Sequence, residues 1–523
     1  MNIKRTALSV GVSALLVSGL YACEGCRATR ATIDAPVSDV GIPTLRLYVV
    51  SNLAGALEPC GCSKDQLGGM DHLGAFIRSE GKKVPASVIL TAGPTFFMEP
   101  ELKGDRMEQD KAKAETIAVS LRQLGLGGAA LGENDWAGGD EVVKMLAEKA
   151  GLALSTGLTS ALREVGGVKL GILSISAKGA PADVAGATKA ALAELRAKGA
   201  QVTVALVAID RGEAKRLADL VPELSLIVVG KKRSQTDHND TAPPIERIGD
   251  VLVIETANHL QTVGVLDLYV RDGGYRFADA TGIERAQRRQ ELTRGIDDLR
   301  VKVANWEKDP KISQSDIMAR KGDLERKEKE RDALDVAPPP AKGSFFRFTM
   351  KEVRAKLGSD EATQETMRAF YKKVNERNRL AFADRKPRPV EGGQASFIGV
   401  QACATCHEPA KKFWDKTAHA KAYATLSTQF KEFNLECVSC HVTGYEMPGG
   451  STVTHVDGFK DVQCETCHGP GSKHRDNPMD RTAIERSPKA SMCVTCHHPP
   501  HVEQFDAAAK MELIVGPGHG RGR

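Results

Sequence analysis

Short apolar segments alternate with amphipathic segments between residues 44 and 280. The apolar segments have the length and composition of buried strands, and they read LRLYVVSN, ASVILTAG, VKLGILSIS, VTVALVAI, LSLIVVG and GVLDLYVRD. Between them, stretches such as AKAETIAVSLRQLG and DEVVKMLAEKAG place apolar residues at helical spacing. This alternation predicts a layered α/β domain with a largely buried sheet.

The pattern becomes highly charged between residues 281 and 337. Apolar residues recur there at helical spacing in two passes that Pro310 separates: Leu292, Ile296, Leu299, Val303 and Trp306, then Ile317, Leu324 and Leu334. We expect a helical hairpin that acts as a spacer or a brace, because a dimerising coiled coil needs longer regular heptads. Residues 338–395 predict a strand, then a helix and a polar linker.

Residues 1–22 have the pattern of a bacterial export signal, with two basic residues followed by a short apolar run and small residues. The apolar run is too short for a retained membrane-spanning helix. The sequence LYAC resembles a lipoprotein cleavage site with Cys23 as the lipidated residue, although Tyr21 is unusual at its position in that pattern. We therefore expect a protein that a lipid anchors to a membrane surface on the periplasmic side of a bacterial membrane, with residues 23–43 as a tether.

Four copies of the sequence C-x-x-C-H lie after residue 400. They are Cys403, Cys406 and His407; Cys437, Cys440 and His441; Cys464, Cys467 and His468; and Cys493, Cys496 and His497. In this motif two thiols form thioether bonds to a porphyrin, and the adjacent imidazole binds the haem iron. Zinc sites and disulfide frameworks use the same gap between cysteines, but neither needs a histidine after every second cysteine. The motifs therefore predict four covalently bound c-type haems.

Histidines are concentrated in the same part of the chain, where ten of the thirteen lie. Those outside the motifs are His419, His455, His474, His498, His501 and His519. They compete for the sixth coordination positions of the haem irons. A haem with a second protein ligand suits electron transfer, whereas an open position suits binding of a small molecule. Both possibilities stay open for each iron.

The charge balance gives no support for nucleic acid as a partner. The formal net charge is +5, and the fourteen basic residues after position 395 are matched by fourteen acidic residues. Haem propionates would make this region acidic, whereas nucleic-acid binding needs a basic surface. Closely packed haems form an electron-transfer chain, so we expect redox proteins as partners.

Residues 396–523 resemble the tetrahaem cytochrome c-554 family in the order and spacing of four segments. The segments are QACATCHEPAKKFWDKTAHAKAY, ECVSCHVTGY, CETCHGPGSKH and CVTCHHPPHVEQF. The resemblance implies a mainly α-helical domain packed around haems, with His419 and His474 as distal iron ligands. His519 or His501 would serve a third haem.

Residues 44–280 resemble the 5′-nucleotidase-like branch of the calcineurin-like metallophosphoesterases. SNLAGALEP, LTAGPTFF, LGENDWAGG and VVGKKRS stand where that family has its metal-binding motifs. The resemblance implies a four-layer α/β sandwich, but the family's metal ligands are missing. The replacements are Asn52, Ala54, Pro94, Lys231 and Arg233. We therefore expect a catalytically inactive domain that serves as a scaffold or docking module.

The segment LEPCGCSKDQLGG contains two cysteines, Cys60 and Cys62, that are too close for a relaxed mutual disulfide. These thiols would either have a soft-metal or redox role, or one of them would form a disulfide with Cys26; the nearby His72 modestly favours a ligand cluster. The sequence does not choose between these two roles.

Together these features predict an exported tetrahaem c-type cytochrome that relays electrons outside the cytoplasmic membrane. The first alternative is a multihaem oxidoreductase that acts on a small nitrogen or sulfur compound at an open iron. A weaker alternative is a 5′-nucleotidase-like phosphoesterase. An electron-transfer protein fits better than a hydrolase, because two-metal hydrolysis needs ligands that the chain lacks.

Overall fold

The computed structural model describes residues 41–59, 66–153, 156–234, 238–271, 276–309, 312–332, 334, 340–498, 501–502 and 505–519. The predicted export signal, most of the predicted tether, and Cys23, Cys26, Cys60 and Cys62 lie outside these residues. No helix in the described ranges combines the length and the apolar character that crossing a bilayer requires.

The first of two mixed sheets contains six strands. In spatial order they are β11 (Ala278–Asp279), β12 (Phe345–Glu352), β10 (Thr262–Tyr269), β1 (Leu45–Ser51), β2 (Ser87–Gly93) and β3 (Leu126–Leu131). β1 pairs in parallel with β2 and antiparallel with β10. All residues of β1 are buried, which explains why its sequence is a nearly continuous apolar run.

The second sheet also contains six strands. In spatial order they are β4 (Leu158–Val165), β5 (Val168–Ile175), β6 (Val202–Ala208), β7 (Leu226–Gly230), β9 (Val251–Ile254) and β8 (Glu246–Ile248). The inner strands β5, β6, β7 and β9 run parallel to one another, and β4 and β8 are antiparallel edge strands. The exposed, charged residues of β4 suit its edge position.

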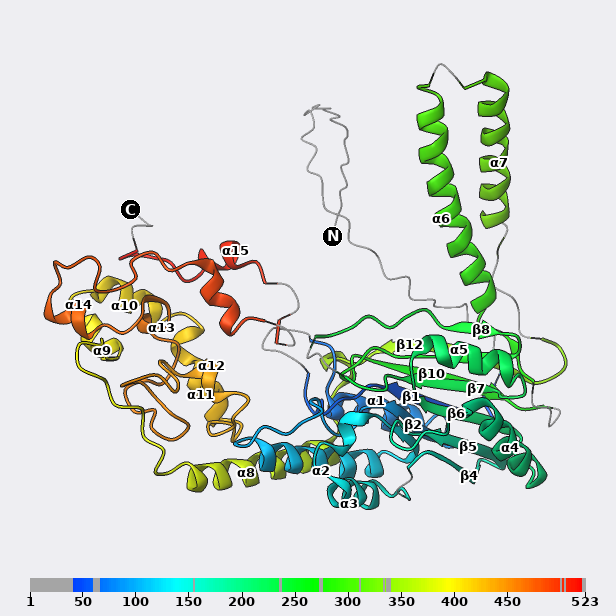
Figure 1. The fold of residues 1–523 in the computed structure, drawn as a ribbon, viewed down its shortest axis with the longest axis horizontal. Coiled ribbons are helices and arrows are strands. Elements are labelled where there is room, and N and C mark those ends of the chain that lie inside the picture. The colour runs from blue at the N-terminus through cyan, green and yellow to red at the C-terminus, as the bar shows by residue number, and fades with distance from the viewer. Residues whose placement is uncertain are drawn as a thin grey trace, which may run out of the picture. The chain divides into compact units, whose positions relative to one another are not determined.

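The two sheets pack against each other, and helices cover their outer faces (Figure 1). Leu47 and Val49 of β1 meet residues such as Val204 of β6 between the sheets. The first sheet is covered by α1 (Met70–Gly81), α2 (Met107–Gln123), α3 (Asp140–Ala150) and α8 (Glu361–Ala381). The second sheet is covered by α4 (Val184–Ala197) and α5 (Arg211–Leu220). The predicted four-layer α/β sandwich is confirmed.

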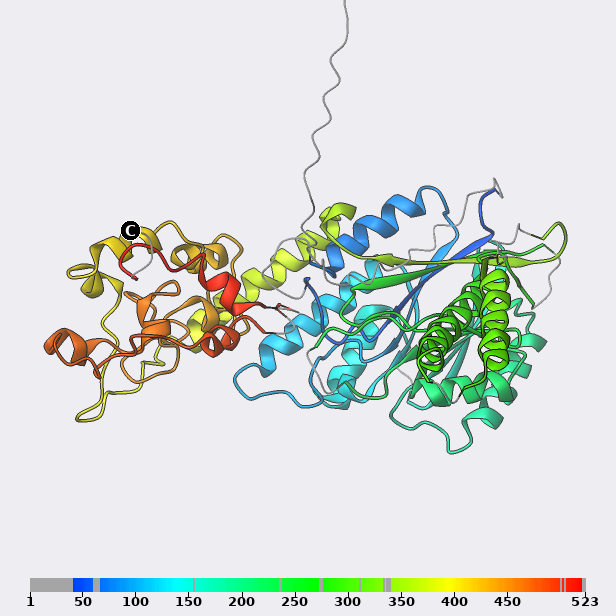
Figure 2. The same cartoon turned by 90° about the horizontal axis from the view of Figure 1, so that it is seen from above.

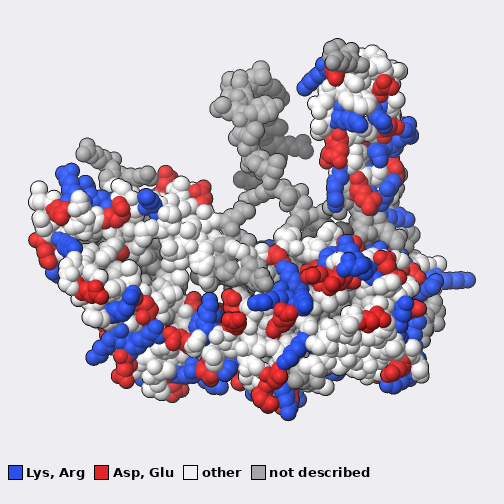
Figure 3. Space-filling view, viewed as in Figure 1, with Lys and Arg blue, Asp and Glu red and all other residues white. Residues whose placement is uncertain are grey.

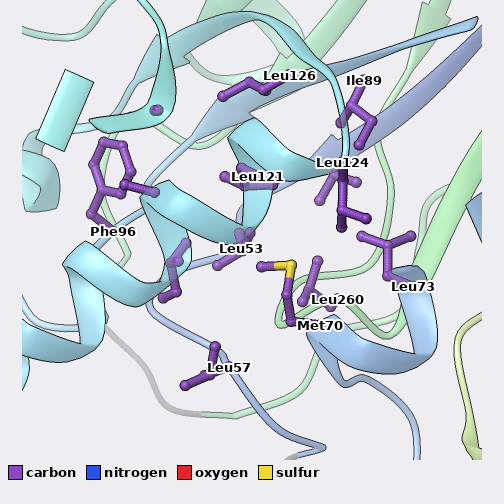
Figure 4. Close-up of a cluster of buried hydrophobic side chains, with 14 of the residues drawn as sticks. Leu53, Leu57, Met70, Leu73, Ile89, Phe96, Leu121, Leu124, Leu126 and Leu260 are labelled. Atoms are coloured by element: carbon purple, nitrogen blue, oxygen red, sulfur yellow. The ribbon is translucent and has the colours of Figure 1, made fainter. Parts of the chain in front are cut away.

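The core beneath α1 and α2 shows how the sequence alternation produces these layers. Tyr48 and Val50 of β1 point away from the other sheet and join the helices, because successive side chains of a strand face opposite sides. Met70 and Leu73 of α1 converge there with Leu121 of α2 (Figure 4). Each face of β1 therefore belongs to a different apolar layer.

The sandwich extends beyond the boundary that the sequence suggested at residue 280. β12 pairs with β10 over eight residues of each strand, from Thr262 opposite Glu352 to Tyr269 opposite Phe345. The following helix α8 contributes Met367 and Phe370 to the core under α1 and α2. Residues 345–381 therefore complete the first sheet and its helical cover.

A helical hairpin precedes β12. It consists of α6 (Ile283–Trp306) and α7 (Gln314–Asp332), which lie side by side (Figures 1 and 2). Arg288 pairs with Glu330 at 2.6 Å, and Lys321 pairs with Glu307 at 2.6 Å across the two helices. Both charge signs are intermixed along the hairpin surface (Figure 3). Such exposed pairs hold the register of the helices more than they stabilise the fold.

The C-terminal region from residue 396 is mainly helical, with many short helices and little apolar core. Its α-helices are α9 (Val400–Ala404), α10 (Glu408–Trp414), α11 (Ala422–Ser427), α12 (Val438–His441), α13 (Cys464–His468), α14 (Ser472–Asp476) and α15 (Ala507–Met511). Two 3₁₀ helices span His419–Lys421 and Ala490–Thr495. The apolar cluster of this region consists of Tyr423, Val438, Val442 and Val456, with Tyr445 packed against it. So small a core suits a domain whose cofactors supply most of the interior.

Candidate functional site

Each C-x-x-C-H motif forms a turn of helix or lies at the end of one. In the first motif the backbone N–H of His407 donates to the carbonyl oxygen of Cys403 at 3.0 Å, and in the fourth that of His497 donates to Cys493 at 2.8 Å. Side chains three and four positions apart lie on the same face of a helix. The turn therefore presents both thiols and the imidazole to one side, as covalent attachment and axial ligation of a haem require.

Three motif histidines face a second histidine from a distant part of the chain. The ring centroids are 6.2 Å apart for His407 and His474, 6.2 Å for His419 and His497, and 6.3 Å for His468 and His519. Imidazole nitrogens bind first-row metals at about 2 Å, and the ring centre lies about 1 Å beyond the nitrogen, so two axial imidazoles on one metal have centroids about 6 Å apart. Each pair is thus spaced to hold one iron between its rings.

The second motif differs, because no imidazole among the described residues is paired with His441 in this way. The Nδ1 atom of His441 lies 2.6 Å from the carbonyl oxygen of Ala422, and that of His468 lies 2.7 Å from the carbonyl oxygen of Glu485. A carbonyl oxygen only accepts, so Nδ1 carries the proton in both rings. The Nε2 atom is then the free ligand atom, and the contact fixes the ring's orientation.

Burial favours the neutral form of three of the paired imidazoles. It lowers the pKa of His419, His497 and His519, and the neighbouring His497 adds to the effect at His419. A neutral imidazole is the form that binds a metal. The remaining predicted ligand, His501, contacts His498, with ring centroids 5.5 Å apart.

The motif thiols also reveal which attachment sites are neighbours. Interaction with Cys403 lowers the pKa of the Cys464 thiol, and interaction with Cys496 lowers the pKa of the Cys440 thiol to about 6. Thioether bonds would abolish these titrations, so the shifts matter only as signs of proximity. The first site therefore adjoins the third, and the second adjoins the fourth.

Hydrogen bonds of side-chain amides join the loops at one edge of the sandwich. The phosphoesterase motifs would lie at this edge. Asn52 accepts the backbone N–H of Lys231 on Oδ1 at 2.6 Å. Asn134 donates through Nδ2 to the carbonyl oxygens of Met98 at 2.6 Å and Ser234 at 3.1 Å. These bonds join the loops after β1, β2, β3 and β7, so the amides tie backbone segments together.

Asp135 is fully buried at the same edge. Its carboxylate accepts the backbone N–H groups of Thr95 at 2.9 Å, Phe96 at 2.7 Å and Gly132 at 3.0 Å. Burial raises the pKa of Asp135 to about 7, and these N–H groups act in the opposite direction. Asp135 therefore holds the loop after β2 against the loop after β3.

Charged groups at this edge are paired with each other. Lys231 Nζ lies 2.8 Å from Asp240 Oδ2, and Pro94 has no side-chain ligand atom.

The Nδ1 atom of His72, which the sequence suggested as part of a ligand cluster, lies 2.6 Å from the carbonyl oxygen of Gly358. Within the described ranges, no group of three or more His, Cys, Asp or Glu residues is arranged to hold a metal ion.

Two residues that matter for the second haem motif were missed in the sequence. Gln109 and Asn378 are both completely buried and bind the segment just before Cys437. Both lie on the apolar stripe of a helix, since Gln109 precedes Ile117 by eight positions and Asn378 follows Val374 by four. A polar amide within an apolar stripe was the signal that could have identified them.

Comparison with known proteins shows which proteins the C-terminal region resembles. Residues 402–469 match the family model for cytochrome c554 and c-prime. Cytochrome c-554 of Nitrosomonas europaea is 34% identical over 112 residues, which cover 18% of this chain and 48% of that protein. The chain thus spans about half the length of this relative. These matches show that the C-terminal region is similar to this cytochrome family over the residues that carry the first three C-x-x-C-H motifs.

The solved structures that are similar to this chain include a 5′-nucleotidase precursor and a calcineurin-like phosphoesterase. A 5′-nucleotidase precursor from Thermus thermophilus matches 78% of this chain and 71% of its own at 14% identity, with a TM-score of 0.43. The calcineurin-like phosphoesterase YfkN from Bacillus subtilis matches 65% of this chain and 99% of its own at 11% identity, with a TM-score of 0.38. The fold class is therefore assigned from the observed sheets and the helices that cover them.

Replacing Asp135 by Asn is expected to destabilise the sandwich. The new amide group would point an N–H toward backbone N–H groups, and a buried donor without an acceptor costs about 1–3 kcal/mol. Urea unfolding followed by circular dichroism measures the change. The control is Asp140→Asn. The side chain of Asp140 is 72% exposed, so this replacement should change the free energy of unfolding little. Equal stability of the two variants would contradict the structural role of Asp135.

Proposed function

We propose that the protein is an exported tetrahaem c-type cytochrome that relays electrons outside the cytoplasmic membrane. The spacing of the three histidine pairs carries this proposal. Each pair joins a motif histidine to a histidine outside the motifs, with ring centroids 6.2 or 6.3 Å apart. Iron with two imidazole ligands has no vacant position for a substrate, which suits electron transfer.

The residues of the chain have clear tasks toward haem in this proposal. Bound haem supplies one-electron oxidation and reduction. The cysteines of the four motifs hold the porphyrins, and the motif histidines together with His419, His474 and His519 hold the irons. Proximity of the thiols orders the sites as first, third, fourth and second. Burial raises the pKa of the Cys467 thiol of the third motif, and Cys493 of the fourth motif lies close enough to add to this effect. Neighbouring sites in this order suit a relay.

An oxidoreductase function at the second site is the alternative, and one observation favours it. His441 has no paired imidazole among the described residues, unlike the other three motif histidines. A haem at Cys437 and Cys440 would then have a free sixth position. A small nitrogen or sulfur compound is the class of ligand that such an iron would bind.

We assign the sandwich domain a scaffold role without hydrolytic activity. Two-metal hydrolysis needs anionic and imidazole ligands that hold the ions about 3.5 to 4 Å apart. Here Asn52, Asn134 and Asp135 are engaged with backbone groups. Lys231 places a cation at a position where the family has a metal ligand. These contacts favour a domain that is stable without metal ions.

The proposed location is the periplasmic side of a bacterial membrane, with acyl chains on Cys23 as the anchor. The support is the N-terminal sequence, together with haem attachment, which in bacteria takes place outside the cytoplasm. Redox proteins would be the partners, at a membrane surface and without nucleic acid.

Single replacements of the paired histidines test the haem assignment. His474→Ala, His419→Ala and His519→Ala should each open one iron, so each variant should bind one more equivalent of carbon monoxide than the unaltered protein. His501→Ala is the control and should add none, because His501 faces His498. Titration of the reduced protein with carbon monoxide, followed by visible absorption, gives the count. A gain for His501→Ala in place of His519→Ala would reassign the third ligand, and no gain in any variant would refute the pairing.

The sandwich is expected to show no phosphoester hydrolysis. The full-length protein would be assayed on nucleotides and a generic aryl phosphate with manganese, zinc or calcium, because these metals serve related hydrolases. An intact metallophosphoesterase in the same assay is the positive control. Metal-dependent turnover that Asn134→Ala or Asn52→Ala abolishes would overturn the scaffold role.

A further inference from the structure

The segment of residues 431–436, just before the second haem motif, is held by the sandwich domain. α2, α8 and the loop after β1 all contact it. Cys437 follows directly, and α12 begins at Val438. The second motif is therefore built against the sandwich.

The centre of this contact is a set of three buried amides, Gln109, Asn378 and Asn434, which we call the amide ladder. Gln109 Nε2 donates to Asn434 Oδ1 at 3.0 Å, and Asn378 Nδ2 donates to Gln109 Oε1 at 3.0 Å. Gln109 and Asn378 are fully buried, and Asn434 is 2% exposed. Unpaired amides would be costly in such a place, so the ladder fixes the segment in one position.

The amide ladder continues into the haem motif through the backbone. The N–H of Leu435 donates to Gln109 Oε1 at 3.0 Å. The carbonyl oxygen of Asn434 accepts the N–H groups of Cys437 at 3.0 Å and Val438 at 2.9 Å. A shift of Gln109 would therefore displace the turn that carries the thiol of Cys437.

Charged residues form a second set of contacts beside the ladder, the Glu436 cluster of Arg106, Lys113 and Glu436. Lys113 Nζ lies 3.1 Å from both carboxylate oxygens of Glu436, and Arg106 Nη2 lies 2.9 Å from one of them. Lys113 is 16% exposed and Glu436 is 28% exposed, so solvent screens the cluster only in part.

The negative charge of Glu436 affects the pKa of the Cys437 thiol, which is a haem attachment group. Burial raises the pKa of Cys437 to about 12, and the Glu436 carboxylate adds to the effect. Burial also opposes ionisation of Glu436, but Lys113 and Arg106 outweigh it and keep the pKa of that carboxyl below its usual range. A lowered carboxyl pKa stabilises the folded state at pH values above 4.5, and this contribution is lost as the pH falls through the lowered pKa.

At the other end of the segment a lysine joins it to the sandwich. Lys431 Nζ lies 2.7 and 2.6 Å from the two carboxylate oxygens of Glu58 and 4.4 Å from the centre of the Tyr371 ring. The residue Lys431 is buried, with 8% exposure. Both ends and the middle of the segment are therefore fixed by side chains of the sandwich.

We infer that the sandwich domain sets the position and the reduction potential of the haem attached at Cys437 and Cys440, through the amide ladder and the Glu436 cluster. This inference rests on the proposed tetrahaem function. Ferric haem carries one more positive charge than ferrous haem, so a nearby carboxylate favours the ferric form and a nearby ammonium group favours the ferrous form. Surrounding charge and burial are among the factors by which a protein sets a haem potential.

Opposite charge changes within the Glu436 cluster test this inference. In the full-length haem protein, Glu436→Gln should raise the midpoint potential of the haem at Cys437 and Cys440, and Lys113→Met should lower it. Lys111→Met, on the same helix but paired with Glu108, is the matched control and should leave the potential unchanged. Spectroelectrochemical titration measures the potentials. The haem in question is the one whose spectrum none of the three histidine replacements alters.

A double variant separates electrostatics from disturbed folding. Glu436→Gln combined with Lys113→Met removes both charges without leaving either partner alone, and its potential should lie between those of the two single variants. Shifts in the same direction for both single variants, or no shift in either, would overturn the inference. The haem content of the unaltered protein and of each variant is measured in the same experiment. Absence of haem from the unaltered protein would refute the tetrahaem proposal. Unchanged potentials in variants that bind all their haems would refute only the inference that the sandwich domain sets the potential.

Discussion

The C-terminal region buries too few apolar residues to be stabilised by an apolar core of its own. Among the described residues of this region eight apolar side chains are buried, and four of them, Tyr423, Val438, Val442 and Val456, form its apolar cluster. A domain of this size normally needs a much larger apolar core, or metals or covalent links that replace it. Four porphyrins attached at the C-x-x-C-H motifs would supply that interior. The short helices and the facing histidines then follow from the need to surround and ligate cofactors.

In the proposed account the sandwich domain supports the region that carries the haem motifs. Its core is built from two packed sheets and the helices that cover them. Asn52, Asn134 and Asp135 join the loops at one edge of the sandwich directly. The amides of Gln109 and Asn378 bind the segment just before the second haem motif. The proposed scaffold role rests on these contacts.

Local patterns were sufficient to predict the elements that depend on neighbouring residues. The run LRLYVVS became β1 because both faces of that strand are buried, and the charged stretch with helical spacing became α6 and α7. The haem motifs could be recognised because a helical turn places two cysteines and a histidine on one side. Each of these features is fixed within a few residues of sequence.

Features that depend on distant pairing could not be predicted in the same way. β12 joins β10 although the whole α6–α7 hairpin lies between them, so the sequence suggested a domain boundary too early. The sequence left His519 and His501 as alternatives, because only the path of the chain decides which of them meets His468. Gln109 and Asn378 gain their importance from a segment more than 50 residues away.

The mass of the mature, full-length protein tests the central claim most directly: the account predicts four haem additions, and a chain with fewer additions, or with zinc bound at the cysteines, would contradict it.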